Sequence, residues 1–394
     1  MFKRRNKLMI PGPVDVWEDT LETMGRPIVP HYGDEWIRLY WETIDLVKKV
    51  FQTKNDVYIL TSSGSGAMDA CLGSMFYSGE KIAVVCNGPF ANRLIEICNG
   101  YDLPVVKVES EWGRRADVDK MRDAFKQHPD IACVAVVANE TGTGVKNPVK
   151  ELAQVAHEHD VPIFVDAVSA MGGYNLPVDE WELDVVCTVP NKCLETPPGV
   201  GLLSLSERAW KLIDAKKADR RHGWYMNLSA WKEYVESPVW GPWHPYPITM
   251  ACANVLALRT SLKRILEEET LAGHWARYAW AQRIVRAGMR NIGCELVAVE
   301  EDASPTVTSI WKRPDMEVKE MVDYMEREHG FMMAGATGAL AGKVFRISHM
   351  GKASTKEYLF PCLLGLEDYL RTTKGLDIPV GASLIGLAGS KPWY

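Results

Sequence analysis

The sequence lacks the features that mark membrane, disulfide-rich and nucleic-acid-binding proteins. No apolar run approaches the roughly 18 residues that a membrane span requires. None of the nine cysteines forms a CxxC pair, and most lie in apolar runs, which indicates buried thiols in a reducing cytosol rather than disulfides or zinc ligands. The net charge is -6, so no basic excess favours nucleic acid or an acidic membrane surface as a partner.

A targeting segment and a metal-binding pattern are also missing. Only three apolar residues follow the basic N-terminus before Pro11, which is too few for a secretory signal. His157 and His159 lie two residues apart on a predicted helix and therefore point to different faces, so we expect no metal there. We predict a cytoplasmic protein that uses no metal ion and binds neither a membrane nor nucleic acid.

The chain instead has many short apolar runs that alternate with amphipathic segments. Apolar residues make up 47% and charged residues 24%, a globular composition, and 394 residues suit two domains. Unbroken apolar runs predict strands buried on both faces, as in a mostly parallel open sheet covered by helices. We therefore predict an α/β fold with strands at 57–61, 82–88, 104–110, 131–140, 161–169, 183–190 and 200–206.

The pattern changes after about residue 255. Segment 222–247 holds four tryptophans and several prolines, and either packs as a surface excursion or covers a subunit interface or an active-site mouth. Fewer strands separated by amphipathic helices then predict a smaller α+β domain. Its expected elements are a helical stretch over roughly 250–290, strands at 294–299, 306–311, 331–336 and 343–350, and helices at 317–328 and 355–371.

Polar residues directly follow the apolar runs of the predicted sheet. Ligands of open parallel sheets bind beyond the carboxyl ends of the strands, so these residues should meet at one edge. That edge gathers a glycine–serine loop, a carboxylate and a lysine. The residues are 62–66, Asn87, Gly88, Asn139, Glu140, Thr141, Asp166, Asn191 and Lys192.

The glycine–serine loop at 62–66 precedes a predicted helix. Free backbone N–H groups and hydroxyls at a helix N-terminus form an anion site, although an ordinary serine cap explains the same residues equally well. The loop is not a dinucleotide fingerprint, because GxGxxG is absent, and it is not a Walker loop, because no GK[ST] follows.

Asp166 and Lys192 are charged residues in apolar surroundings. Asp166 ends the run IFVD, where a buried carboxylate requires a cation such as a protonated pyridine nitrogen, unless it merely caps the next turn. Lys192 lies between an apolar run and a proline–glycine turn. Such a lysine is usually exposed or ion-paired, but desolvation also lowers its pKa and frees the amine to attack an aldehyde. The combination of these residues favours a cofactor site.

Six motifs in order resemble the class V aminotransferases of pyridoxal-phosphate (PLP) fold type I, within them the alanine–glyoxylate, serine–pyruvate and serine–glyoxylate group. They are SGSG, NGPFANR, NETGTG, VDAVSAMGG, NKCLETPPG and FRISHMG, and the likeness runs from MIPGP at 9–13 to Arg346. It implies a PLP enzyme that moves the amino group of alanine, serine or aspartate to glyoxylate or pyruvate by a ping-pong mechanism.

The same resemblance implies a homodimer with shared active sites. We expect an N-terminal segment, 1–20, packed on a neighbouring subunit, a large PLP-binding domain, 21–265, and a small C-terminal domain, 266–394.

The resemblance also assigns roles to individual residues. Lys192 carries PLP as a Schiff base and moves the substrate's α-proton, Asp166 pairs with the ring nitrogen, and Arg346 binds the substrate carboxylate, with Gly12 also at the substrate. The other cofactor residues are Phe90 and Val168 on the ring faces, Ser63, Gly64 and Ser65 at the phosphate, Thr143 and Asn191, and Tyr246 and Thr249 at the phosphate of the neighbouring subunit.

Three departures from the family pattern bear on these roles. Gly142 stands where a hydroxyl near the ring is usual, and Ser348 and His349 follow Arg346 close to the expected carboxylate site. The letters NKC also resemble pyridoxamine–pyruvate aminotransferase, which treats the vitamin as a substrate and departs from the SGSG loop. Because that loop is intact here, we expect bound phosphate and PLP as a true cofactor.

Two further alternatives remain open at this point. A PLP lyase or desulfurase needs a mobile catalytic cysteine, whereas Cys193 directly follows Lys192 in a turn and is poorly placed to reach substrate sulfur. The second alternative is a non-catalytic homologue kept as a subunit of another complex. The intact set of Asp166, Lys192 and Arg346 argues against it.

Overall fold

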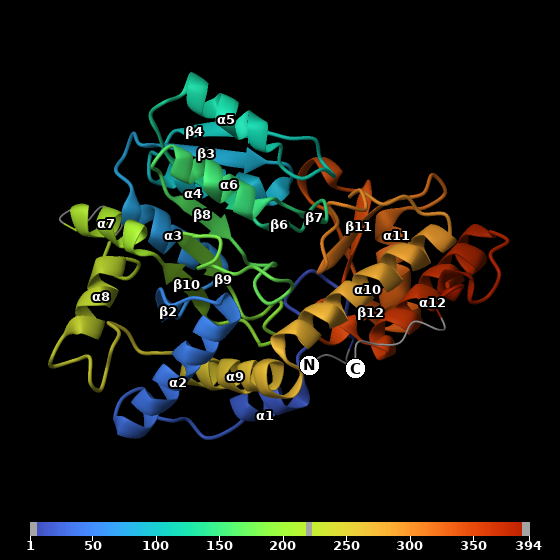
Figure 1. Cartoon of the computed structure of the whole chain (residues 1–394). Helices are drawn as coiled ribbons and strands as arrows, with labels where there is room; N and C mark the ends of the chain where they lie inside the picture. Colours follow the sequence, from blue (N-terminus) through green and yellow to red (C-terminus); the bar gives the residue numbers. More distant parts are fainter. Residues whose placement is uncertain (1–5, 218–222, 388–394) are drawn as a thin grey trace.

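A seven-stranded sheet with helices on both faces forms the larger part of the structure (Figure 1). The computed structural model describes residues 6–217 and 223–387, so the ends of the predicted domains and residue 222 of the tryptophan-rich segment lie outside the described residues. The strand order is β2-β10-β9-β8-β5-β3-β4, with β10 antiparallel to both neighbours and the other pairs parallel. Each of the seven predicted runs overlaps one strand of this sheet, namely β2 (Asp56–Leu60), β3 (Lys81–Cys86), β4 (Val105–Glu109), β5 (Ile131–Val137), β8 (Ile163–Asp166), β9 (Val185–Thr188) and β10 (Gly201–Leu205).

Several helices of this larger part bury one apolar stripe against the sheet or against another helix. Helix α6 shows the rule, because Val149, Leu152 and Val155 share one face and are buried, and this is the face that packs on β5 and β8. None of the helices within the described ranges is both long and apolar enough to cross a membrane. The helices are α1 (Glu18–Met24), α2 (Asp34–Phe51), α3 (Gly64–Met75), α4 (Pro89–Gly100), α5 (Val118–Gln127), α6 (Val149–Glu158), α7 (Glu207–Ala215), α8 (Leu228–Glu236) and α9 (Cys252–Lys263).

The smaller part has its own hydrophobic core beside the first (Figure 1). An antiparallel sheet of order β11-β14-β13 packs beneath long helices, as the predicted α+β pattern requires. Its elements are α10 (Leu271–Asn291), β11 (Val307–Trp311), α11 (Val318–Tyr324), β13 (Ala334–Gly335), β14 (Val344–Ser348) and α12 (Lys356–Lys374). Short elements complete the chain: β1 (Lys7–Leu8), β6 (Asn139–Glu140), β7 (Val145–Lys146), β12 (Phe331–Met332), η1 (Arg264–Glu268), η2 (Met325–His329), η3 (Gly338–Leu340), η4 (Gly351–Ser354) and η5 (Ala382–Leu384).

Two sequence predictions were wrong in detail. The single helical stretch over 250–290 is broken at Thr270, whose φ of 65° ends the preceding turn and whose hydroxyl accepts the Gly273 N–H to begin α10. Segment 294–299 forms no strand and makes only an isolated bridge between Leu296 and Ile310. The tryptophan-rich segment 222–247 contains a helix, α8, which Asn227 caps.

The N-terminal strap, residues 7–17, runs between the two parts of the molecule. Its strand β1 pairs in parallel with β12, and the Met9 carbonyl accepts the Ser348 N–H at 2.8 Å. Met9 is fully buried in the core of the smaller part. The strap therefore packs within its own chain, and contact of residues 1–20 with a neighbouring subunit stays a prediction.

Candidate active site

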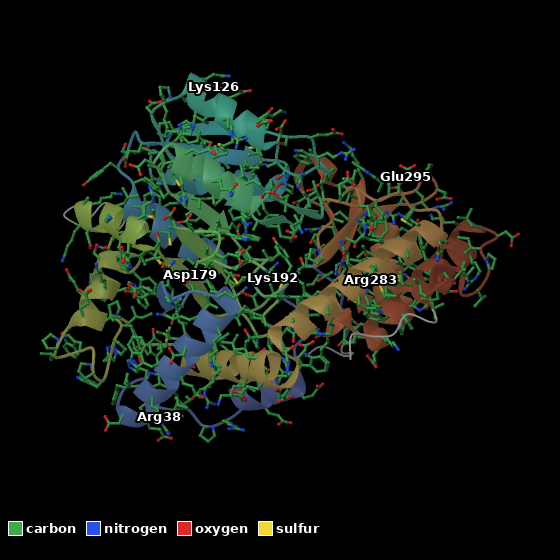
Figure 2. All side chains as sticks on the ribbon, viewed as in Figure 1. Arg38, Lys126, Asp179, Lys192, Arg283 and Glu295 are labelled. Carbon is green, nitrogen blue, oxygen red and sulfur yellow. The ribbon has the colours of Figure 1, made fainter. Side chains whose placement is uncertain are left out.

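A cavity of about 390 Å³ opens at the carboxyl edge of the large sheet. This volume lies in the range of small-molecule sites. Figure 2 shows Lys192 where the larger and smaller parts meet. The cavity brings together eight of the predicted residues: Ser63, Gly64, Ser65, Phe90, Asp166, Val168, Asn191 and Lys192.

Asp166 places a carboxylate at the end of the central strand β8. Its Oδ1 accepts the Val168 N–H at 2.9 Å, and no lysine or arginine among the described residues forms an ion pair with it. Burial raises the pKa of Asp166 to about 6, although the Val168 N–H and the charges of Lys192 and Arg93 lower it. A buried carboxylate in this state is suited to a cation supplied by a ligand.

Lys192 lies on the loop that follows β9, and its Nζ donates to the carbonyl of Pro11. Burial lowers the pKa of Lys192 to about 8, against the opposing influence of Cys193, and nearby Arg346 lowers it further. Gly12 has a φ of 104°, and a Cβ there would lie 2.5 Å from Lys192 Cε. The strap thus lies close to the end of the Lys192 side chain, and the positive φ favours glycine at this position.

The predicted phosphate loop begins helix α3. Ser63 caps the helix by accepting the Gly66 N–H at 3.3 Å, which leaves the first-turn N–H groups and the Ser65 hydroxyl at the cavity. A Cβ on Gly64 would lie 2.8 Å from Val168 Cγ2, so glycine lets the helix start approach the sheet edge. An anion site, a carboxylate that requires a cation and an amine of lowered pKa are the groups that the phosphate, ring nitrogen and aldehyde of PLP need. The residues present therefore fit this cofactor.

Glu140 is a functional residue to which sequence reasoning gave no role. Its side chain is fully buried, and it accepts the N–H groups of Phe90 at 2.9 Å, Ala91 at 3.3 Å and Gly142 at 2.8 Å. It thereby fixes the start of α4, which carries Phe90 into the cavity. Burial raises the pKa of Glu140 to about 7, partly offset by these three N–H groups. An acidic residue directly after an apolar strand was the available signal.

Arg93 is a second residue that went unassigned, since it was noted only as the last letter of NGPFANR. It lines the cavity, and its guanidinium lies over the Phe90 ring at 5.6 Å. Its charge lowers the pKa of both Asp166 and Lys192. Arginine three positions after an aromatic on a helix was the signal for this contact.

Arg346 lies on β14 of the smaller part and does not line the cavity itself. Its Nε and Nη2 donate to the Gly335 carbonyl at 3.2 and 2.8 Å, and no carboxylate among the described residues pairs with it. Burial lowers the pKa of this guanidinium, while the charge of Glu140 raises it. The side chain is only 8% exposed, so a charge this enclosed is suited to an anionic ligand.

Other residues predicted for the site lie outside the cavity. Thr143 is buried and its hydroxyl donates to the Asn87 carbonyl at 3.4 Å. Tyr246 is buried, with its hydroxyl donating to the His31 carbonyl, and Thr249 is exposed at a separate depression. His349 is fully buried against the Thr308 hydroxyl, so it is not available to a substrate.

Comparison with known proteins gives a consistent family. The model of the family "Aminotransferase class-V" matches residues 18–357. An uncharacterised aminotransferase of Methanocaldococcus jannaschii is 35% identical over 89% of this chain and 89% of its own length. The soluble hydrogenase 42 kDa subunit of Anabaena cylindrica is 31% identical over 91% of this chain and 92% of its own.

Solved structures agree with the sequence relatives. The crystal structure of ureidoglycine–glyoxylate aminotransferase from Bacillus subtilis superimposes with a TM-score of 0.91 at 28% identity, covering 98% of this chain and 97% of that one. Further relatives bear the names of transaminases that use glyoxylate or pyruvate.

We expect Glu140→Gln to alter stability in a pH-dependent way. The folded-state pKa of Glu140, about 7, lies above its ordinary value of 4.5, so its contribution to stability is full below pH 4.5 and is lost as pH rises through 7. The advantage of the wild type over the variant in free energy of unfolding should therefore shrink between these pH values. Urea unfolding at several pH values measures it, and an advantage that grows with pH would contradict the assignment.

Lys192 should titrate as an unusually acidic amine once the cofactor is removed. With a pKa of about 8 rather than 10.5, half of the amine is neutral, and therefore nucleophilic, at pH 8. Labelling by an amine-reactive reagent, followed by peptide mass spectrometry, should show a midpoint there. The exposed Lys319 serves as internal reference, and a Lys192 midpoint near pH 10.5 would refute the expectation.

Proposed function

Because the chain belongs to the class V aminotransferases, we propose that it transfers the amino group of a small L-amino acid to glyoxylate or pyruvate. It is a PLP-dependent transaminase. The proposed donors are alanine, serine or aspartate. The relatives named for glyoxylate or pyruvate support the acceptor.

The observation that carries this proposal is the buried guanidinium of Arg346, which has no carboxylate partner among the described residues. A carboxylate matches the planar fork of an arginine with two parallel hydrogen bonds. Amino acids and 2-oxo acids carry that same group, so one arginine serves both halves of an exchange. This shared use of one arginine supports a ping-pong order, in which the two substrates occupy the same site in turn.

The residues of the cavity divide the chemical work. Bound PLP supplies an aldehyde that bonds amino groups and a ring that withdraws electrons from the adjacent carbon. Ser63, Gly64 and Ser65 hold the phosphate, and Asp166 keeps a proton on the ring nitrogen. The Lys192 amine removes the α-proton of the substrate and returns it, as general base and then acid. Its lowered pKa supports this role.

The remaining assigned residues enclose the ring and the substrate. Phe90, Val168 and Asn191 line the cavity, where Phe90 and Val168 would hold the two faces of the ring. Thr143, outside the cavity, donates to the carbonyl of Asn87, two residues before the helix α4 that carries Phe90. Gly12 makes room for the Lys192 amine next to the substrate.

We also propose that the active unit is at least a dimer in which Tyr246 and Thr249 contact the neighbouring cofactor. Exposed aromatic side chains on the same segment, Trp240 and Trp243, support a subunit contact there. The Tyr246 hydroxyl now donates to the His31 carbonyl, so it has to release that bond to reach a phosphate.

The alternative reactions receive less support. Desulfurase chemistry needs an accessible thiolate, but Cys193 is fully buried and burial raises its thiol pKa. The intact phosphate loop disfavours pyridoxamine–pyruvate exchange. One relative is named as a hydrogenase subunit, which favours a non-catalytic role. The cavity that brings Asp166 and Lys192 together argues against that role.

The Lys192→Ala variant tests the central assignment. It should lose covalent PLP and fall at least about a hundredfold in transamination rate, because general acid–base catalysis contributes that much. The wild type is assayed with alanine, serine and aspartate against glyoxylate and pyruvate, following cofactor absorbance. Wild-type turnover in the variant, or no absorbance change with any donor, would sink the proposal.

Arg346→Gln tests the carboxylate contact. The KM values for donor and acceptor should both rise by about 10- to 100-fold, since a charge-assisted bidentate pair contributes roughly 1.4–3 kcal/mol. Arg290→Gln, on the exposed end of α10, is the matched control and should behave as wild type. A change in only one of the two KM values would contradict a shared carboxylate site.

A further inference from the structure

A buried cluster of charged and aromatic side chains lies behind the loop that carries Lys192. The Glu195 cluster consists of Trp17, Glu195, Arg264, Arg277 and Tyr278, and none of these residues lines the cavity. Glu195 follows Lys192 by three residues, is fully buried, and has a φ of 59°. Left-handed backbone at a non-glycine residue and a buried charge are both costly.

Four side chains converge on the Glu195 carboxylate from elements far apart in sequence. The Arg277 Nη2 donates at 2.7 Å and the Tyr278 hydroxyl at 2.8 Å, both from α10. Trp17 of the N-terminal strap donates at 2.6 Å, and Arg264 of η1 at 3.1 Å. Burial alone would raise the pKa of Glu195. The surrounding cations, with Arg277 the strongest, outweigh burial and lower this pKa to about 2, so the group is charged.

The same two residues of α10 also hold the loop that follows the Arg346 strand. The Tyr278 hydroxyl accepts the Gly351 N–H at 3.0 Å, and the Arg277 Nη1 donates to the Gly351 carbonyl at 3.1 Å. Gly351 lies five residues beyond Arg346. Towards Lys192, His274 of the same helix bonds the Cys193 carbonyl at 2.9 Å. Helix α10 therefore connects both loops through fully hydrogen-bonded groups.

We propose that Glu195 is a positioning residue that, through Arg277 and Tyr278, sets the spacing between Lys192 and Arg346. This inference rests on the proposed function, in which Arg346 holds the carboxylate while Lys192 acts one carbon away. That geometry tolerates little error, because a displacement of about 1 Å in a reacting group can lower a rate a hundredfold. Glu195 thereby controls affinity for the substrate carboxylate.

A purely stabilising role accounts less well for the arrangement. Apolar residues of similar volume often stabilise a core as well as a buried ion pair does, so stability alone does not require these charges. Directional bonds that link two specific loops are suited instead to fixing their separation. The N-terminal strap adds a second connection, since Met9 bonds Ser348 while Pro11 accepts from Lys192.

Tyr278→Phe in the holoenzyme tests the proposal with little change in volume. We expect kcat to fall about tenfold or more, and the KM for the amino donor and the dissociation constant of propionate to rise about tenfold, with cofactor absorbance retained. Propionate has the carboxylate but no amino group, so calorimetry reports the Arg346 site without turnover. Tyr369→Phe removes another buried hydroxyl, bonded to Glu320, and should leave both constants unchanged.

Glu195→Gln is the second variant and should show the same rise, because its neutral amide retains an acceptor but loses the charge. If it fails to fold, Tyr278→Phe decides alone. A lower melting temperature with both constants within about twofold of the wild type would overturn the proposal. Absence of propionate binding to the wild type would overturn it as well. Loss of wild-type transamination with propionate binding intact would refute only the proposed function.

Discussion

Burial of the Asp166 carboxylate without a cation from the protein is the constraint on which the rest of the active site depends. The strand that ends there, β8, is central in the sheet, and Asp166 lines the cavity with only 5% of its surface exposed. Burial raises its pKa to about 6. The Val168 N–H and the charges of Lys192 and Arg93 oppose this rise in pKa. The site is therefore electrostatically incomplete without a cationic ring nitrogen. Burial, with the charges of Arg346 and Arg93, lowers the pKa of Lys192 to about 8 even though the charge of Asp166 opposes this.

A second buried carboxylate, Glu140, lies near Asp166 and affects the charges of the site. Burial and, after it, the charge of Asp166 raise the pKa of Glu140, and the charge of Glu140 raises the pKa of Arg346 on the other part of the molecule. Its three backbone N–H partners serve geometry as well, since they fix the turn that presents Phe90. The Glu140 side chain thus sets both the charge and the shape of this part of the site, although no obvious motif marks its position.

Much of the fold and about half of the site could be predicted from local sequence patterns. Apolar runs identified all seven strands of the large sheet, and the rule that ligands bind at carboxyl strand ends identified the cavity with Asp166 and Lys192. Contacts that join distant segments were not predictable. Glu140 bonding Phe90 spans 50 residues and Pro11 bonding Lys192 spans 181. Thr143 was placed by resemblance alone, and its hydroxyl faces Asn87 rather than the cavity.

The two hydrophobic cores carry different groups of the proposed site. Every described cavity residue belongs to the larger part, whereas Arg346 belongs to the smaller one. In the proposed function, the groups that bind the cofactor and the Arg346 that binds the substrate therefore rest on separate hydrophobic cores, joined by the strap and by α10. Changes in the smaller core can shift the arginine relative to the lysine without disturbing the cofactor. The joining bonds have to keep that spacing. A change in these bonds, rather than in either core, is therefore the most direct way to alter affinity for the substrate carboxylate.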